Sequence, residues 1–148
     1  MNTRLCYNST DRRYELRANQ RILSTHPNRQ DAQLAQLGQE APEAVALAQP
    51  LISAHPELAD RALRAVALVA DGAVKPNGGA GRYFVQSQAG KGDSYLVDLT
   101  ASTCTCPDWE QRAPEVNGRK LCKHVLAALF TRKLQPQPVA IQGGGDPR

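Results

Sequence analysis

Residues 103–130 read TCTCPDWEQRAPEVNGRKLCKHVLAALF and contain three of the four cysteines of the 148-residue chain. Cys104 and Cys106 form a C-x-C pair, and fifteen residues separate this pair from the C-x-H pair of Cys122 and His124. Zinc prefers a tetrahedron of four thiolate and imidazole ligands of this kind. The spacing therefore predicts one Zn²⁺ bound by Cys104, Cys106, Cys122 and His124.

The expected local geometry of these four residues allows one tetrahedral site. On an extended segment, residues two apart point to the same side, so Cys104 and Cys106 can both face the metal. Within a regular helix, Cys122 and His124 would lie about 200° apart and could not meet. We therefore expect Cys122 to precede a helix and His124 to lie in its first turn. Trp109 is expected to pack over the site and shield it, and stacking on a base is the alternative.

Two other uses of these residues have to be weighed against zinc binding. A C-x-C pair can form a disulfide or take part in redox chemistry, and a Cys–His pair can act as nucleophile and base. No orienting acid or oxyanion element is recognisable near the Cys–His pair, and coordination by three cysteines and one histidine leaves no open position for a substrate. We therefore expect no enzymatic activity and no small-molecule substrate. Cys6 is isolated and is expected to be a free thiol.

The sequence on either side of the cysteine pairs predicts a β-hairpin and a helix. RYFVQSQ (82–88) and SYLVDL (94–99) are typical of strands, and the Gly-rich AGKGD (89–93) is typical of the turn between them. KLCKHVLAALFTRKL (120–134) predicts a helix. Its expected buried stripe is formed by Val125, Leu126 and Leu129.

Taken together, these features resemble the SWIM-type zinc finger, as it occurs in small bacterial-type SWIM-domain proteins. The resemblance covers residues 82–134 and includes the two strands, both metal-binding pairs and the helix. It implies a ββα fold and Zn²⁺ bound by the same four residues. The spacer between the two pairs lies on the long side for the family, so residues 111–119 are expected to form an exposed loop. Members of the family bind DNA or protein.

Residues 29–75 are rich in alanine and predict short helices. Pro42 suits the first turn of a helix, and Pro50 is expected to end or kink that helix. Pro56 opens the clearest helix of the segment, residues 57–71.

This clearest helix has one apolar stripe and is expected to end at Gly72. The stripe consists of Leu58, Ala62, Ala65, Val66 and Val69. A stripe of this kind predicts burial in a core, and a docking surface for a partner is the alternative. Residues 76–81 are rich in glycine and predict a linker. The expected fold class is α+β, with short N-terminal helices followed by a small ββα zinc finger.

The two ends of the chain show no clear periodicity. Residues 1–28 are expected to form a flexible basic arm, and the alternative is an arm that becomes ordered on nucleic acid. Residues 135–148 are rich in Pro and Gly and predict a disordered tail.

Charge is distributed unevenly along the chain. Residues 1–30 and 72–148 each carry a net charge of +4, whereas residues 31–71 carry −4, with a pI near 9.0 for the whole. The basic segments favour nucleic acid as the partner, with DNA bound through its backbone. A protein partner, docked on the acidic helices or the finger, is the alternative. The candidate nucleic-acid contacts are Arg12, Arg13, Arg17, Arg112, Arg119, Lys120, Lys123, Arg132 and Lys133.

The apolar residues are dispersed along the chain. No stretch approaches the roughly 20 apolar residues of a membrane span, and the N-terminus lacks the apolar segment of a secretory signal. These patterns predict a cytoplasmic protein without a membrane partner, in a reducing compartment where paired thiols favour metal binding.

Overall fold

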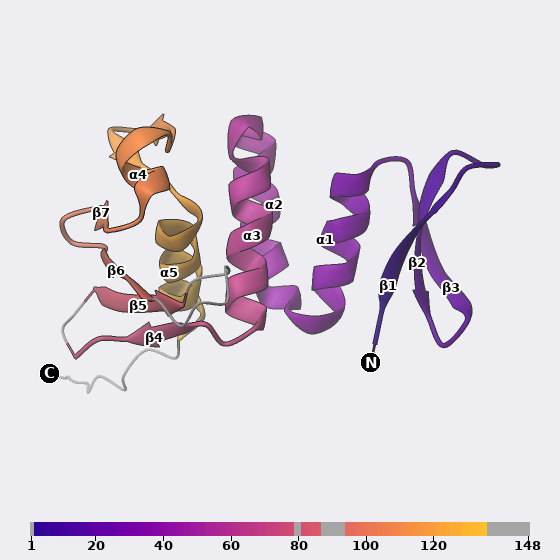
Figure 1. Cartoon of the computed structure of the whole chain (residues 1–148), viewed down its shortest axis with the longest axis horizontal. Helices are drawn as coiled ribbons and strands as arrows, with labels where there is room; N and C mark the ends of the chain where they lie inside the picture. The colour runs from indigo at the N-terminus through magenta and orange to yellow at the C-terminus, as the bar shows by residue number, and fades with distance from the viewer. Residues whose placement is uncertain (1, 79–80, 87–93, 136–148) are drawn as a thin grey trace, which may run out of the picture.

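The computed structural model describes residues 2–78, 81–86 and 94–135 and shows a mixed α+β chain (Figure 1). An antiparallel sheet comes first, three helices follow, and a second sheet and a last helix complete the chain. The first half contains β1 (Arg4–Asn8), β2 (Arg13–Ala18), β3 (Arg21–His26), α1 (Arg29–Glu40), α2 (Pro42–Ala54), the 3-10 helix η1 (Pro56–Leu58) and α3 (Ala59–Ala70). The second half contains β4 (Val74–Pro76), β5 (Arg82–Gln86), β6 (Ser94–Asp98), β7 (Thr103–Cys104), α4 (Pro107–Gln111), β8 (Glu115–Val116), β9 (Arg119–Lys120) and α5 (Lys123–Leu134).

The N-terminal sheet corrects the expectation of a flexible basic arm over residues 1–28. Its strand order is β1-β2-β3, and every pairing is antiparallel. Strand β2 alternates apolar and charged residues, so Leu16 and Ala18 are buried on one face of the sheet, next to α1. Asn19 and Gln20 both have positive φ angles and form the tight turn into β3. The basic residues of this segment are therefore fixed on strands and turns.

Glu15 lies on the opposite face of this sheet, where neighbouring side chains cover it. Its carboxylate accepts a hydrogen bond from Asn8 Nδ2 at 3.0 Å and another from Arg17 Nε at 2.9 Å. These two hydrogen bonds, first that from Asn8, lower the pKa of Glu15. Arg17 is thus engaged within the protein, whereas Arg13 on the same strand is exposed.

The central helices occupy the segment predicted for them, with one difference at the end of α2. Pro42 is the first residue of α2, as expected, but Pro50 does not end this helix, which continues to Ala54. Pro50 is exposed. Ala48 and Ile52, which lie two positions before and after it, are buried and hold this part of the helix in place.

The C-terminus of α3 is closed by Gly72, as the sequence predicts. Gly72 has a φ of 68°, its N–H donates to Val69, and the N–H of Ala73 donates to Leu68. This is the paired hydrogen bonding of a Schellman motif. It turns the chain directly into β4.

Residues on both sides of the predicted linker at residues 76–81 pair instead as strands β4 and β5, and residues 79–80 lie outside the described residues. Val74 pairs with Val85 across these strands, and the N–H of Asn77 donates to the carbonyl of Arg82 at 2.9 Å. Gly81 has a φ of 77°, and an added Cβ there would meet Thr100 Oγ1 at 3.0 Å. The finger therefore has a four-stranded sheet, β4-β5-β6-β7, rather than a hairpin alone. The predicted turn at 89–93, the end of the first predicted strand at 87–88 and most of the predicted tail lie outside the described residues.

The spacer between the two metal-binding pairs is more ordered than the exposed loop expected for residues 111–119. Strands β8 and β9 pair through Val116 and Arg119, with Asn117 and Gly118 between them at φ angles of 53° and 80°. Asn-Gly with two positive φ angles is the preferred two-residue hairpin turn. The side chains of this hairpin remain mostly exposed.

One hydrophobic core joins the helices to the finger. The cluster of buried residues extends from Leu34 of α1 to Phe130 of α5, and α3 and α5 pack side by side. The predicted stripe of α3 is buried in this core, except that Val69 is only half-buried. Helix α5 is buried over most of its circumference by α2, α3 and the sheet. Among the described residues, no helix is long and apolar enough to cross a membrane.

Candidate metal centre

Cys104 and Cys106 are held by the edge of the second sheet. Cys104 ends β7 and pairs with Val97 of β6. Between the two cysteines, Thr105 is bound to β6 twice: its Oγ1 accepts from the N–H of Leu96 at 3.0 Å, and its own N–H donates to the Leu96 carbonyl at 3.2 Å. Because Thr105 is anchored towards β6, the cysteines on either side of it point together towards the interior, as predicted.

Cys106 is also the N-cap of α4. Its backbone is extended, Pro107 is the first helical residue, and its Sγ accepts a hydrogen bond from the N–H of Trp109 at 3.3 Å. A backbone N–H directed at the sulfur stabilises the thiolate form that binds metal.

Cys122 and His124 occupy the start of α5 in the predicted arrangement. Cys122 is the extended N-cap residue, with φ −91° and ψ 172°, and its Sγ accepts from the N–H of Val125 at 3.5 Å. His124 is the second residue of the helix and is 2% exposed. Its Nδ1 lies 4.0 Å from Cys122 Sγ, and Tyr95 packs against its ring with the centroids 4.7 Å apart.

The four residues form one buried cluster whose donor atoms all lie within 4.8 Å of one another. A tetrahedral zinc, with Zn–S near 2.3 Å and Zn–N near 2.0 Å, places its donor atoms about 3.5–3.8 Å apart, so the cluster fits this ion. His124 Nε2 is buried without a hydrogen-bond partner in the described part of the chain. Cys6, His26 and His55 lie on other elements and outside this cluster.

The three thiols interact strongly without a metal. Hydrogen bonds from Cys104 and then Cys122 lower the pKa of Cys106. Hydrogen bonds to Cys106 and Cys122, followed by burial, raise the pKa of Cys104. The cluster thus favours one thiolate that the neighbouring thiols stabilise. A metal ion would take the place of these shared protons, so metal binding releases protons and weakens at low pH.

Two side chains of the spacer contact each other next to Cys106. Trp109 is half-buried and packs against the core, and Lys120 Nζ lies 4.9 Å from the centroid of its ring. This cation–π contact connects β9 to α4. The expected shielding role of Trp109 is consistent with its position beside Cys106.

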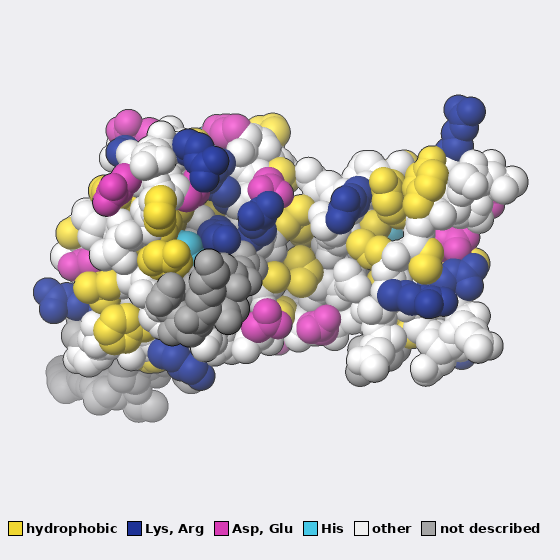
Figure 2. All heavy atoms as spheres, in the orientation of Figure 1, with side chains coloured by type: hydrophobic (Ala, Val, Ile, Leu, Met, Phe, Trp, Pro, Cys, Tyr) yellow, Lys and Arg dark blue, Asp and Glu magenta, His cyan; other side chains and the backbone are white. Residues whose placement is uncertain are grey.

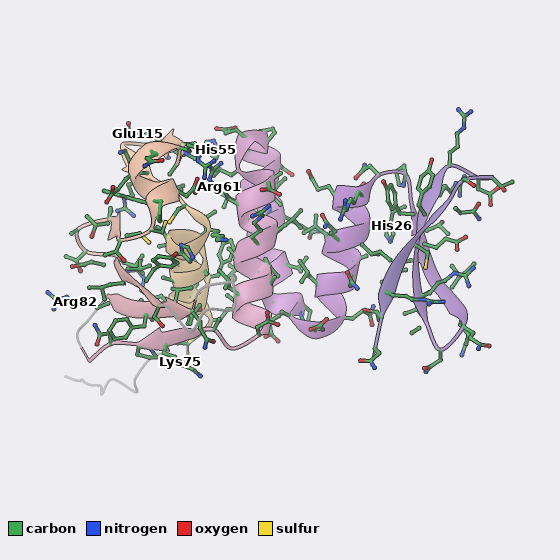
Figure 3. The ribbon with its side chains drawn as sticks, in the orientation of Figure 1. His26, His55, Arg61, Lys75, Arg82 and Glu115 are labelled. Carbon is green, nitrogen blue, oxygen red and sulfur yellow. The ribbon has the colours of Figure 1, made fainter. Side chains whose placement is uncertain are left out.

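An ion pair between Arg61 and Asp108 connects α4 to α3, outside the finger. Arg61 of α3 donates from Nε to Asp108 Oδ2 at 3.0 Å and from a terminal nitrogen to Oδ1 at 2.9 Å, and it also reaches the carbonyl of Arg112 at 3.3 Å. Figure 3 shows Arg61 on the side of α3 that faces the finger. The hydrogen bond with Asp108 raises the pKa of Arg61. Sequence reasoning missed this pair, because Arg61 and Asp108 lie 47 positions apart.

The fold and the buried CCCH group define a small metal-binding domain of the zinc-finger class. Residues 88–133 match the family model of the SWIM zinc finger. The chain therefore contains a SWIM zinc finger domain, and its CCCH group is consistent with Zn²⁺. Comparisons with curated proteins and with solved structures gave no match.

The structure distributes the nine candidate nucleic-acid contacts over three places. Arg12, Arg13 and Arg17 belong to the N-terminal sheet and its first turn, and Arg132 and Lys133 lie in the last turn of α5. The remaining four lie in the spacer and at the start of α5: Arg112 directly after α4, Arg119 and Lys120 on β9, and Lys123 on α5. Binding of nucleic acid by these residues stays a prediction.

Proposed function

We propose that this chain is a non-enzymatic, zinc-stabilised accessory protein that binds nucleic acid, with DNA as the expected target. The observation that carries the proposal is the contrast between its two kinds of site. The metal centre is buried, and its four protein ligands complete a tetrahedron, which leaves no position for a substrate. Exposed arginines, in contrast, are available near the finger and on the N-terminal sheet.

Contacts to the backbone are favoured over contacts to bases. The usual way to read bases is a helix inserted into the major groove. Helix α5 is unsuited to this role, because six of its twelve residues are buried in the core. Its exposed basic residues, Arg132 and Lys133, stand at its C-terminal end. We therefore expect weak discrimination between sequences.

A salt titration tests the proposal. The zinc-loaded protein is titrated against a fluorescent 20-base-pair duplex at several NaCl concentrations. Several phosphate contacts require the logarithm of the binding constant to fall with the logarithm of salt, with a slope of about −0.9 per contact. Absence of binding at low salt would overturn the proposal. A preference above about a thousandfold for one duplex sequence would overturn the backbone-only form of it.

A second candidate function, protein binding, is favoured by an apolar pair on the finger. Phe84 is 42% exposed, and it faces Leu96 on the neighbouring strand. Contiguous exposed apolar surface marks protein contacts, and these two side chains are neighbours across adjacent strands. Replacing Phe84 with Ser tests this candidate. Loss of a nuclease-resistant partner in a pull-down, with the zinc retained, would support it.

A further inference from the structure

Two adjoining hollows cross the surface between α1 and the finger. One, of about 450 Å³, lies between α1 and α3, and the other, of about 290 Å³, lies between α3, α4 and the start of α5. They share Asp60 and Arg64 of α3 and so adjoin each other, and we call the two hollows together the groove. In Figure 2, Lys and Arg side chains gather across this middle part of the face.

The groove has a clear excess of positive charge. Two acidic side chains line it, Asp60 and Asp108. Five basic side chains line it: Arg29, Arg61, Arg64, Arg112 and Lys123. Arg29 belongs to α1, Arg61 and Arg64 to α3 and Lys123 to α5, while Arg112 directly follows α4, so only the folded chain brings them together.

The acidic residues leave most of the guanidinium donors available. Arg64 contacts Asp60 through Nε at 3.2 Å, and its side chain is 56% exposed. Arg112 Nε is 3.8 Å from Asp108, too far for a hydrogen bond, and its side chain is 76% exposed. Arg61 is fixed by Asp108 through Nε and one terminal nitrogen. The groove therefore presents one guanidinium fixed by an ion pair, that of Arg61, together with the exposed guanidinium groups of Arg29, Arg64 and Arg112.

We propose that this groove binds consecutive phosphates of a nucleic-acid backbone, and that α1 and α3 form the site together with the finger. The inference rests on the proposed function and locates nucleic-acid binding in this groove. Arginine forks match the oxygens of a phosphate bidentately and retain their charge at any physiological pH. No aromatic side chain lines either hollow, so the stacking that holds single-stranded bases is absent from these lining residues. The site therefore recognises the phosphodiester backbone and is indifferent to base identity.

Two triple variants with the same change in charge test the groove. The groove variant replaces Arg29, Arg64 and Arg112 with Ala, and none of these residues is next to a metal ligand. The control variant replaces Arg21, Lys75 and Arg82, three exposed basic residues outside the groove. Both are loaded with zinc, checked for zinc content and thermal unfolding, and titrated against the same labelled duplex and single strand over a range of salt.

We expect the groove variant to lose more than tenfold in affinity at 100 mM salt, and its salt slope to flatten by about two to three units on the duplex. The control variant should change affinity less than threefold. Equal effects of the two variants would overturn the groove while leaving nucleic-acid binding intact. If the unmodified protein shows no binding at low salt, the proposed function fails, and the groove fails with it.

Discussion

At the scale of single residues, two of the metal ligands also cap helices. Cys106 and Cys122 are the N-caps of α4 and α5, and each sulfur accepts a hydrogen bond from a backbone N–H of its helix. Serine is a good N-cap but a poor zinc ligand, so a Cys-to-Ser change separates metal binding from helix capping. A Cys-to-Ala change removes both the metal ligand and the N-cap.

Replacing Cys122 with Ser is therefore expected to abolish stoichiometric zinc binding while α5 keeps its cap. Metal analysis should give one zinc per unmodified chain and far less for the variant. In the metal-free state, Cys122→Ala should be less stable than Cys122→Ser by about 0.5–2 kcal/mol, the usual range for a lost N-cap. Cys6→Ser is the control, and its zinc content should equal that of the unmodified chain. Zinc retained in Cys122→Ser would contradict the assigned ligand set.

Arg61 connects α3 to the segment that carries Cys106. The Arg61 and Asp108 side chains are only 24% and 23% exposed, and two hydrogen bonds join them. Replacing Arg61 with Ala should lower the free energy of unfolding by about 1–2 kcal/mol, more than an open surface pair and less than a fully buried one. It should also speed the removal of zinc by a chelator.

Arg64→Ala is the matched control for Arg61→Ala. Its i,i+4 pair with Asp60 is mostly exposed, so its removal should lower the free energy of unfolding by less than about 0.5 kcal/mol. Chemical unfolding and the rate of zinc release to a chromophoric chelator measure both effects. Equal rates of zinc release in the two variants would show that the Arg61–Asp108 pair does not support the centre.

At the scale of secondary structure, local patterns decide what the sequence reveals. The metal ligands, the entry of Cys122 into α5 and the Gly72 cap all depend on neighbours a few positions away, and they are predicted correctly. The N-terminal sheet was missed although RYELRA alternates strictly, because its turn is Asn19-Gln20 rather than the stronger Asn-Gly. The Asn117-Gly118 hairpin did carry that stronger signal, yet the segment was expected to be an exposed loop, because each of its two strands has only two residues.

Local sequence patterns could not predict the hydrophobic core that the helices share with the finger. The Gly-rich residues 76–81 predict a linker between two units. Glycine is typical of linkers and also of tight turns, so this local pattern is ambiguous. Only the pairing of Val74 with Val85, and the packing of α3 on α5, show that the chain continues within one core. These contacts join segments that are distant in sequence, so a local pattern of glycines cannot predict them.

Removal of zinc is therefore expected to affect the central helices as well as the finger. Helices α4 and α5 hold 5 and 12 residues, about a third of the α-helical residues that the structure describes. If the finger unfolded alone, a chelator would remove no more than that share of the helical circular dichroism. Because α5 fills the core against α2 and α3, we expect a larger loss and one cooperative thermal transition in the zinc-loaded protein. A loss confined to about a third would show that the helices fold independently.

At the scale of the whole molecule, the N-terminal sheet and the finger lie at opposite ends, with the helices between them (Figure 1). Basic residues occur at both ends, whereas the segment between them carries a net charge of −4 over residues 31–71. A long nucleic acid can contact both ends, and a short one can contact only one. The contribution of the sheet should therefore appear in the salt dependence measured with long duplexes.

Replacing Arg12, Arg13 and Arg17 with Ala should weaken binding to every long duplex similarly and flatten the salt slope. Three free cations would account for up to about three units, but Arg17 is engaged by Glu15, so we expect about two. Glu15→Gln tests this reason, because it removes the negative charge beside Arg17 and should steepen the slope of the otherwise unmodified protein by about one unit. Fluorescence anisotropy with duplexes of two unrelated sequences, at several salt concentrations, gives each slope. An unchanged slope in the triple variant would show that the sheet takes no part, and a loss for one sequence alone would show that these arginines read bases.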